Sequence, residues 1–176
     1  MDRGWVALLR AVNLGTRNKV PMAELRALLE RDGFGAVRSH IASGNLLFTA
    51  AAKRTEVAAR VEALILDAFS VRTVAVLRSF AELSKVAASH PFGEDVSHTF
   101  VTFLAAKPPA AAVRALGQLD TGDDEIAVSG KHVFLRYPNG VQGARLSGAA
   151  LEKALGVAGT ARNWRTVTRL AAMTAE

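Results

Sequence analysis

The order of apolar patterns in the first half of the chain constrains its fold more than any other feature. Residues 5–12 (WVALLRAV) are almost continuously apolar, which is typical of a buried strand. After Pro21, apolar residues recur with helical spacing as far as Gly33. Two short strand patterns at 37–42 and 46–49 then flank a turn, which predicts a hairpin.

A second helix is predicted over residues 55–69, and a fourth strand over 71–77. The resulting order is strand, helix, strand, strand, helix, strand, which is typical of a ferredoxin-like sandwich. Ser79-Phe80-Ala81-Glu82 then fits a capping box for a connecting helix that ends before Pro91.

The same order restarts in the second half of the chain. The pattern predicts a strand over 98–105, a helix over 109–119, strands over 125–128 and 133–137, and a helix over 147–155. No last strand is recognisable, because residues 163–173 indicate a helix. The hairpin turns Ser43-Gly44-Asn45 and Ser129-Gly130-Lys131 resemble each other, and together with the repeated element order they indicate a duplication.

These patterns predict an α+β protein of two ferredoxin-like (βαββαβ) subdomains. The first comprises residues 1–78, a connecting helix and loop comprise 79–97, and the second comprises 98–176, with a C-terminal helix in place of its last strand. Both alternating sets of residues in the first strand are apolar, so we expect both faces of its sheet to be covered. Helices would cover one face, and the sheet of the second subdomain is a candidate for covering the other. A covered sheet disfavours base stacking on exposed aromatic residues and places Trp5 and Phe48 in the core.

The net charge of +6 is distributed unevenly along the chain. Residues 1–50 carry seven basic and four acidic side chains (+3), residues 51–140 carry ten of each (0), and residues 141–176 carry five and two (+3). A basic balance favours anionic partners and says nothing about fold. The alternative is a compositional bias, since an Arg-rich and Ala-rich chain often reflects GC-rich coding.

Several classes of protein are disfavoured by composition. The chain has no cysteine, which excludes disulfide frameworks, thiolate nucleophiles and cysteine zinc sites. The apolar stretch Trp5–Leu9 is interrupted by Arg10 and is too short for a signal-peptide core or a membrane span. We therefore expect a soluble, cytoplasmic protein without a membrane partner.

Four segments carry a recognisable pattern: Leu8–Gly15 (LLRAVNLG), Asn18–Met22 (NKVPM), Ser43–Phe48 (SGNLLF) and Arg162–Val167 (RNWRTV). Together with Pro138-Asn139-Gly140, they resemble the DUF1697 family, a group of bacterial proteins of unknown function. The resemblance extends over nearly the whole chain. It implies two ferredoxin-like subdomains in one compact protein, and it implies no established activity.

The first candidate site is the loop that precedes the first helix. It contains Asn13, Asn18 and the permissive Gly15, and Arg17 and Lys19 lie close to the helix N-terminus. Such a loop can cradle a phosphate or carboxylate. It lacks the spacing of a Walker loop or a dinucleotide-binding fingerprint. The alternative is an ordinary polar loop in which asparagines cap the backbone.

The second candidate is the C-terminal helix. If Asn163 caps this helix, Arg165 and Arg169 lie on one face, one turn apart, with Arg162 just before them. This basic ridge could grip phosphates, or it could pair with acidic residues of the other half and lock the subdomains together.

Arg10 is the third candidate, because it lies inside an otherwise apolar strand and a buried guanidinium needs a partner. An internal ion pair explains it equally well. Our leading hypothesis is one basic cleft between the two halves. The residues expected to bind a ligand are Arg10, Asn13, Arg17, Lys19, Asn45, Arg162, Asn163, Arg165 and Arg169.

No catalytic or metal-binding pattern stands out. The four histidines are isolated, the acidic cluster at 120–125 is typical of a solvated turn rather than a Mg²⁺ site, and the serines of the hairpin turns lack the G-x-S-x-G elbow. We expect no metal and no cofactor. The favoured function is binding of an anionic small molecule or nucleic acid. The alternatives are an enzyme acting on a phosphorylated or carboxylated small molecule, and a protein interaction module.

Overall fold

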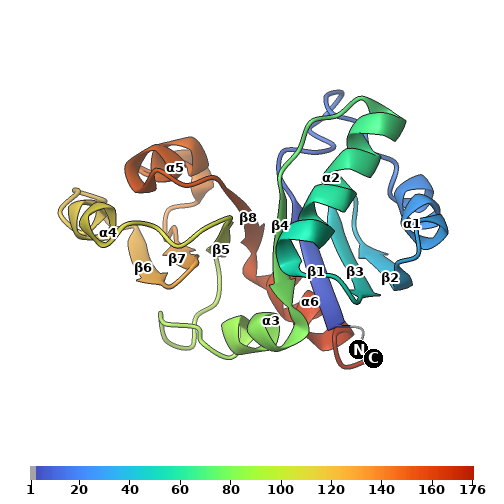
Figure 1. The fold of residues 1–176 in the computed structure, drawn as a ribbon. Helices are drawn as coiled ribbons and strands as arrows, with labels where there is room; N and C mark the ends of the chain where they lie inside the picture. Colours follow the sequence, from blue (N-terminus) through green and yellow to red (C-terminus); the bar gives the residue numbers. More distant parts are fainter. Residues whose placement is uncertain (1–2) are drawn as a thin grey trace. The chain divides into compact units, whose positions relative to one another are not determined.

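Two four-stranded antiparallel sheets organise the chain in a computed structural model that describes residues 3–176 (Figure 1). The structure divides into two units. Unit 1 runs to Ser84 and also contains Met173–Glu176, and unit 2 comprises Lys85–Ala172. Six α-helices accompany the sheets within the described residues, so the protein is a mixed α+β protein.

Unit 1 has the strand order β2-β3-β1-β4. Its elements are β1 (Arg3–Leu9), α1 (Met22–Arg31), β2 (Gly35–His40), β3 (Asn45–Ala50), α2 (Arg54–Phe69), β4 (Ala75–Ser79) and the start of α3 (Phe80–Ala87). Helices α1 and α2 lie on the same face of the sheet (Figure 1). The element order agrees with the prediction, but β1 ends at Leu9 and β4 begins at Ala75, so both predicted strands extended too far into the adjoining loops.

The core of unit 1 forms between the sheet and its two helices. Helix α1 buries Leu25 and Leu29, and α2 buries Val57, Val61 and Ile65. Trp5 and Phe48 belong to the same cluster, as predicted. The opposite face of the sheet is also buried: the fully buried residues there include Val6, Leu8, Leu47 and Arg78. The expectation that neither face is open to solvent is therefore confirmed.

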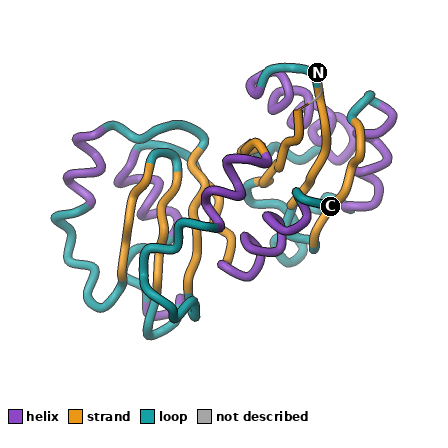
Figure 2. Tube along the Cα trace, turned by 90° about the horizontal axis from the view of Figure 1, so that it is seen from below, coloured by secondary structure: helices purple, strands orange, loops and turns teal. Residues whose placement is uncertain are grey.

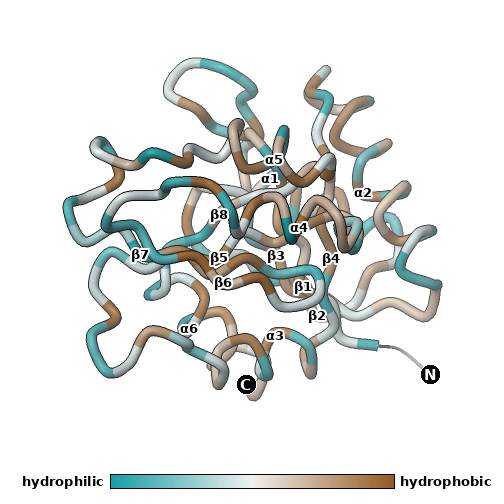
Figure 3. Tube along the Cα trace, turned by 90° about the vertical axis from the view of Figure 1, so that its left-hand side faces the viewer, coloured by the Kyte–Doolittle hydropathy of each residue, from teal (hydrophilic) through white to brown (hydrophobic). Residues whose placement is uncertain are grey.

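Unit 2 has the strand order β6-β7-β5-β8, the same arrangement as in unit 1. The strands of both sheets are drawn in orange in Figure 2. Its elements are β5 (Thr99–Leu104), α4 (Ala110–Leu116), β6 (Glu125–Ser129), β7 (His132–Arg136), the 3-10 helix η1 (Val141–Gly143), α5 (Gly148–Leu155), β8 (Gly159–Asn163) and α6 (Trp164–Met173). Hydrophobic residues mark β5 in Figure 3, and β5 is the central strand that pairs with both β7 and β8.

The prediction that unit 2 lacks its last strand was wrong. β8 pairs antiparallel with β5, from Phe100↔Asn163 to Leu104↔Gly159. The sequence GTARN of β8 has no apolar alternation, because its buried positions are held by Gly159, Thr160 and Arg162. Pairing with β5 fixes this strand, and intrinsic strand propensity contributes little. The helix predicted over 163–173 is α6, which follows β8.

Both units end with a capped helix after the fourth strand. The backbone N–H of Glu82 donates to Ser79 Oγ at 3.1 Å, and the Ser79 N–H donates to the Glu82 carboxylate at 2.7 Å, which confirms the predicted capping box. In unit 2 the N–H of Thr166 donates to Asn163 Oδ1 at 2.8 Å. The same element order and the same cap position support the duplication inferred from the sequence.

Candidate functional site

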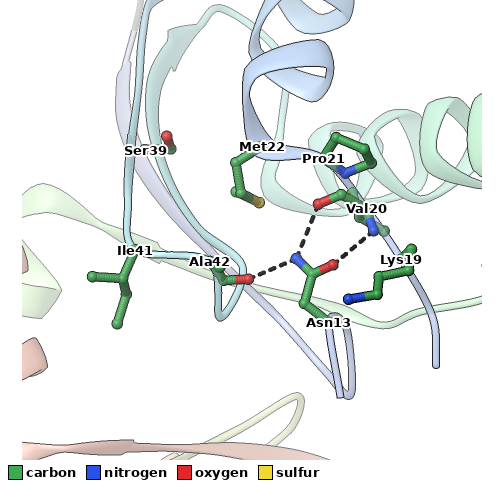
Figure 4. Close-up of a pocket in the computed structure, with 8 residues that line it drawn as sticks. All are labelled: Asn13, Lys19, Val20, Pro21, Met22, Ser39, Ile41 and Ala42. Carbon is green, nitrogen blue, oxygen red and sulfur yellow. Dashed lines mark hydrogen bonds between the residues drawn. The ribbon is translucent and has the colours of Figure 1, made fainter. Parts of the chain in front are cut away.

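Asn13 ties three segments of unit 1 together through its side chain. Its amide nitrogen donates to the carbonyl of Val20 at 2.9 Å and to that of Ala42 at 2.6 Å, and its Oδ1 accepts the N–H of Val20 at 2.8 Å (Figure 4). Both amide hydrogens and one acceptor site are therefore used. The side chain joins the loop after β1, the start of α1 and the β2–β3 turn, and its role is to position these segments.

Gly44 brings the β2–β3 turn against the end of β1. Its carbonyl accepts the N–H of Leu9 at 2.8 Å, and its φ is +85°. A Cβ at this position would lie 2.6 Å from Val12 Cγ2 and 2.8 Å from Leu9 Cβ. Only glycine fits this contact, so the segments that carry the family pattern around Leu8–Gly15 and Ser43–Phe48 are packed on each other.

Four non-glycine residues of these two loops have positive φ angles: Ala11 (55°), Asn13 (52°), Asn18 (50°) and Ile41 (51°). A left-handed conformation is tolerated by asparagine but is unfavourable for alanine and above all for β-branched isoleucine. Each such residue costs about 1–3 kcal/mol, and strained residues of this kind cluster at functional sites. The strain makes this loop pair the strongest candidate site in unit 1.

An open hollow of about 530 Å³ lies between these loops and the start of α1 (Figure 4). We call it the unit 1 hollow; its lining residues are Asn13, Lys19, Val20, Pro21, Met22, Ser39, Ile41 and Ala42. Most of the lining is apolar, and Lys19 is the one cationic residue among the described residues that line it. The Lys19 side chain forms no ion pair or hydrogen bond within residues 3–176. Helix α1 begins after Pro21 without a side-chain cap, and both Pro21 and Met22 at its start line the hollow.

Sequence reasoning missed the apolar part of this lining. Met22 lies on the apolar face of α1 and packs partly against the core, as its helical spacing predicts. Ile41 falls within a predicted strand, whereas it lies in the turn and is 54% exposed. The available signal was an isoleucine close to the Ser43-Gly44 turn. A pattern of residue types does not show that Ile41 adopts a left-handed backbone conformation.

The other unit 1 candidates occupy different environments. Arg10 lies just after β1 and is half-buried, so its predicted place inside the strand was wrong; its N–H donates to the carbonyl of Val74 at 3.0 Å. Arg17 is exposed in the loop, where Leu14 and Arg17 form a small bridge. Asn45 is fully buried and donates to the carbonyl of His40 and to Ser43 Oγ, so it holds the hairpin turn.

The unit 2 candidates are divided between a buried strand residue and an exposed helix face. Arg162 on β8 is buried and donates to Thr160 Oγ1 at 2.6 Å and to the carbonyl of Ala161 at 2.9 Å. Burial lowers the pKa of Arg162 to about 10, which leaves it charged at neutral pH. Asn163 caps α6, and Arg165 and Arg169 are exposed on that helix. Arg162 therefore does not extend the exposed ridge. A single site built from residues of both units stays a prediction.

Other sequence candidates are explained by local bonding. The carboxylates of the acidic cluster contact Arg145, Asn139 and Arg136, in agreement with a solvated turn. Within the described residues no group of three or more histidines and carboxylates is arranged to hold a metal ion. Across the same residues, no helix has both the length and the apolar character that a bilayer span requires.

Comparison with known proteins agrees with this architecture. The chain is similar to a structure of a conserved bacterial protein from Streptococcus pneumoniae, with a TM-score of 0.75, 21% sequence identity and 99% of each chain covered. A search of curated proteins gave no match. The family model described as "Protein of unknown function (DUF1697)" matches residues 2–134. This range includes the patterns around Leu8–Gly15, Asn18–Met22 and Ser43–Phe48, and the chain therefore belongs to the DUF1697 family.

Proposed function

We propose that unit 1 binds a small anionic molecule with an apolar body in the unit 1 hollow. The observation that carries this proposal is the combination of an apolar wall with Lys19, a cation without a partner among residues 3–176, at the uncapped start of α1. A carboxylate or phosphate beside Lys19 would interact with the ammonium group and the helix N-terminus. Met22 and Ile41 would contact the rest of the ligand, as apolar walls do in most small-molecule sites.

Few hydrogen-bonding groups are available for a strongly polar ligand. The Asn13 amide is used by the backbone, and Ser39 Oγ accepts a hydrogen bond from Arg26 at 3.3 Å. The hydroxyl groups of a sugar-like ligand would lose their hydrogen bonds to water on binding and find few partners in the hollow, which is costly. The lining therefore favours one anionic group on an apolar body over a sugar-like molecule.

The test is a calorimetric titration with phenyl phosphate, compared with inorganic phosphate and with neutral benzyl alcohol. We expect phenyl phosphate to bind most tightly, and Lys19→Ala to weaken its affinity about tenfold, the loss of about 1.4 kcal/mol from one charged contact. Lys85→Ala, which removes an equally exposed charge from α3, is the matched control. Equal affinities of the native protein and Lys19→Ala would contradict the proposal.

Nucleic acid is a second candidate ligand, favoured by the exposed Arg165 and Arg169 on α6. Phosphate contacts by these residues would make binding fall steeply with salt. Fluorescence anisotropy with RNA and DNA oligonucleotides at two salt concentrations tests this candidate. Arg165→Ala with Arg169→Ala should reduce the salt dependence, and no binding at low salt would exclude it.

We also propose to class each unit as a ferredoxin-like subdomain. The βαββαβ element order and the strand order with β1 or β5 in the interior of the sheet support this classification.

A further inference from the structure

The first helix of each unit is preceded by the same pattern of residues. Lys19–Arg26 (KVPMAELR) leads into α1, and Lys107–Arg114 (KPPAAAVR) leads into α4. Lysine, proline, alanine, an aliphatic residue and arginine recur at the same spacing. The shared prolines, Pro21 and Pro109, are the N-cap residues of the two helices. The pattern therefore marks equivalent positions in the fold.

Strand pairing shows which residues of the two hairpins correspond. The last pair of the first hairpin is His40↔Asn45, and that of the second is Ser129↔His132. Ser39 and Val128 consequently hold equivalent positions, each one residue before the end of its strand. This register also shows that the turns resembling each other in sequence are offset by one residue, because Asn45 corresponds to His132 rather than to Lys131.

A second hollow lies at the equivalent place in unit 2. It has a volume of about 340 Å³, and its lining includes Lys107, Pro108, Val113, Arg114, Val128 and Gly130. We call it the unit 2 hollow. Like the unit 1 hollow, it combines an apolar wall with a lysine two residues before the N-cap proline.

The two hollows differ in what the shared arginine contacts. In unit 1, Arg26 donates to Ser39 Oγ at 3.3 Å. Val128 replaces this serine in unit 2 and has no side-chain acceptor. The side chains of Arg114 and Lys107 are both exposed, and within residues 3–176 they form no ion pair or hydrogen bond. Two cations therefore line the unit 2 hollow with their charges available to a ligand.

We propose that the unit 2 hollow is a second binding site for an anion with an apolar body, in which Lys107 and Arg114 bind the anionic group. The choice of ligand class rests on the proposed function of unit 1, whereas the site itself rests on residues of unit 2. The guanidinium group adds a planar pair of donors that suits a phosphate or carboxylate. Val113, Val128 and Pro108 form the apolar wall.

The test is an NMR titration of the whole chain with phenyl phosphate, because amide shifts report the two sites separately. We expect saturable shifts at Lys19, Val20, Met22 and Ala23 for unit 1 and at Lys107, Ala110 and Ala111 for unit 2. Lys107→Ala with Arg114→Ala should weaken the unit 2 response at least tenfold and leave the unit 1 response unchanged. Lys85→Ala with Lys153→Ala removes the same charge elsewhere and should change neither.

The outcomes separate the two proposals. Shifts confined to unit 1 and weakened about tenfold by Lys19→Ala overturn the second site and leave the proposed function in place. Shifts confined to unit 2 and weakened at least tenfold by the double substitution overturn the proposed function and leave the second site in place. Shifts that persist unchanged in both variants, or no shifts at all, overturn both.

Discussion

The two units share a strand order but differ in the loops that flank their hollows. In unit 1 the connection from β1 to α1 spans residues 10–21, and the hairpin turn spans 41–44. In unit 2 the corresponding segments are residues 105–109 and the two-residue turn 130–131. The longer loops of unit 1 carry Asn13 and the strained residues, whereas the short loops of unit 2 carry neither.

This difference shows how a longer loop is kept in one conformation. A long polar loop gains backbone entropy when it is released, so it needs specific bonds to stay ordered. Asn13 supplies three hydrogen bonds, and Gly44 lets the turn approach Leu9 and Val12. The result is a hollow of about 530 Å³ in unit 1, compared with about 340 Å³ in unit 2.

The largest effect is expected from replacing the turn glycines. Gly44→Ala introduces a Cβ against Val12 and Leu9 at a positive φ, and should lower the free energy of unfolding by about 3 kcal/mol. Gly130→Ala is the matched control, because its φ is +58° and no atom lies within 4 Å of the added Cβ. It should cost about 1 kcal/mol. Urea unfolding measures both, and equal losses would contradict the packing role of Gly44.

A smaller effect is expected from Asn13→Ala. Three hydrogen bonds are lost from a partly buried position, so the free energy of unfolding should fall by about 2 kcal/mol. Hydrogen exchange of the Val20 amide should accelerate, because its acceptor is removed. Asn139→Ala, an exposed asparagine of unit 2 that contacts Asp123, should change stability by less than about 0.5 kcal/mol. Unchanged protection of Val20 would show that Asn13 does not hold the loop.

The smallest effect concerns pH and the caps of α3 and α6. Burial raises the pKa of Glu82, but hydrogen bonds from Arg54 and from the Ser79 N–H outweigh it and leave the pKa below its usual range. A carboxylate with a lowered folded-state pKa stabilises the fold above its unfolded pKa, and this contribution is lost as the pH falls through the folded pKa. At the unit 2 cap the accepting side chain is the neutral amide of Asn163.

Glu82→Gln should therefore destabilise the protein by about 0.5 kcal/mol at pH 7 and by less at pH 3. Urea unfolding at the two pH values provides the measurement. Glu24→Gln in the first turn of α1 is the control, because the N-cap residue there, Pro21, has no N–H to donate to it. A loss of the same size at both pH values would mean that the charge of Glu82 contributes nothing.

Much of the fold was predictable because its signals are local. The apolar spacing of Leu25 and Leu29 and the capping box at Ser79 each specify one element without reference to the rest of the chain. β8 was not predictable in the same way, since its Thr160 and Arg162 are buried only through pairing with β5. Long-range pairing decides such a strand.

The sequence indicated the loop in which the candidate site of unit 1 lies, but not which of its side chains line the hollow. The sequence placed Lys19 beside a helix N-terminus, and that residue lines the unit 1 hollow. The sequence also predicted ligand binding by Asn13 and Asn45, and this stays a prediction. The side chain of Asn13 donates to the carbonyls of Val20 and Ala42, and that of Asn45 donates to the carbonyl of His40. A sequence shows which residues can donate a hydrogen bond, but only the fold shows which acceptors lie within reach.

The most direct test of the two-hollow account is the number of phenyl phosphate molecules bound per chain, measured by equilibrium dialysis. The account predicts two sites of native affinity for the native protein, one for Lys19→Ala, one for Lys107→Ala with Arg114→Ala, and none when all three substitutions are combined, because each altered site binds about tenfold more weakly or worse. Binding of native affinity in the triple variant would place the anion elsewhere on the molecule and contradict the account.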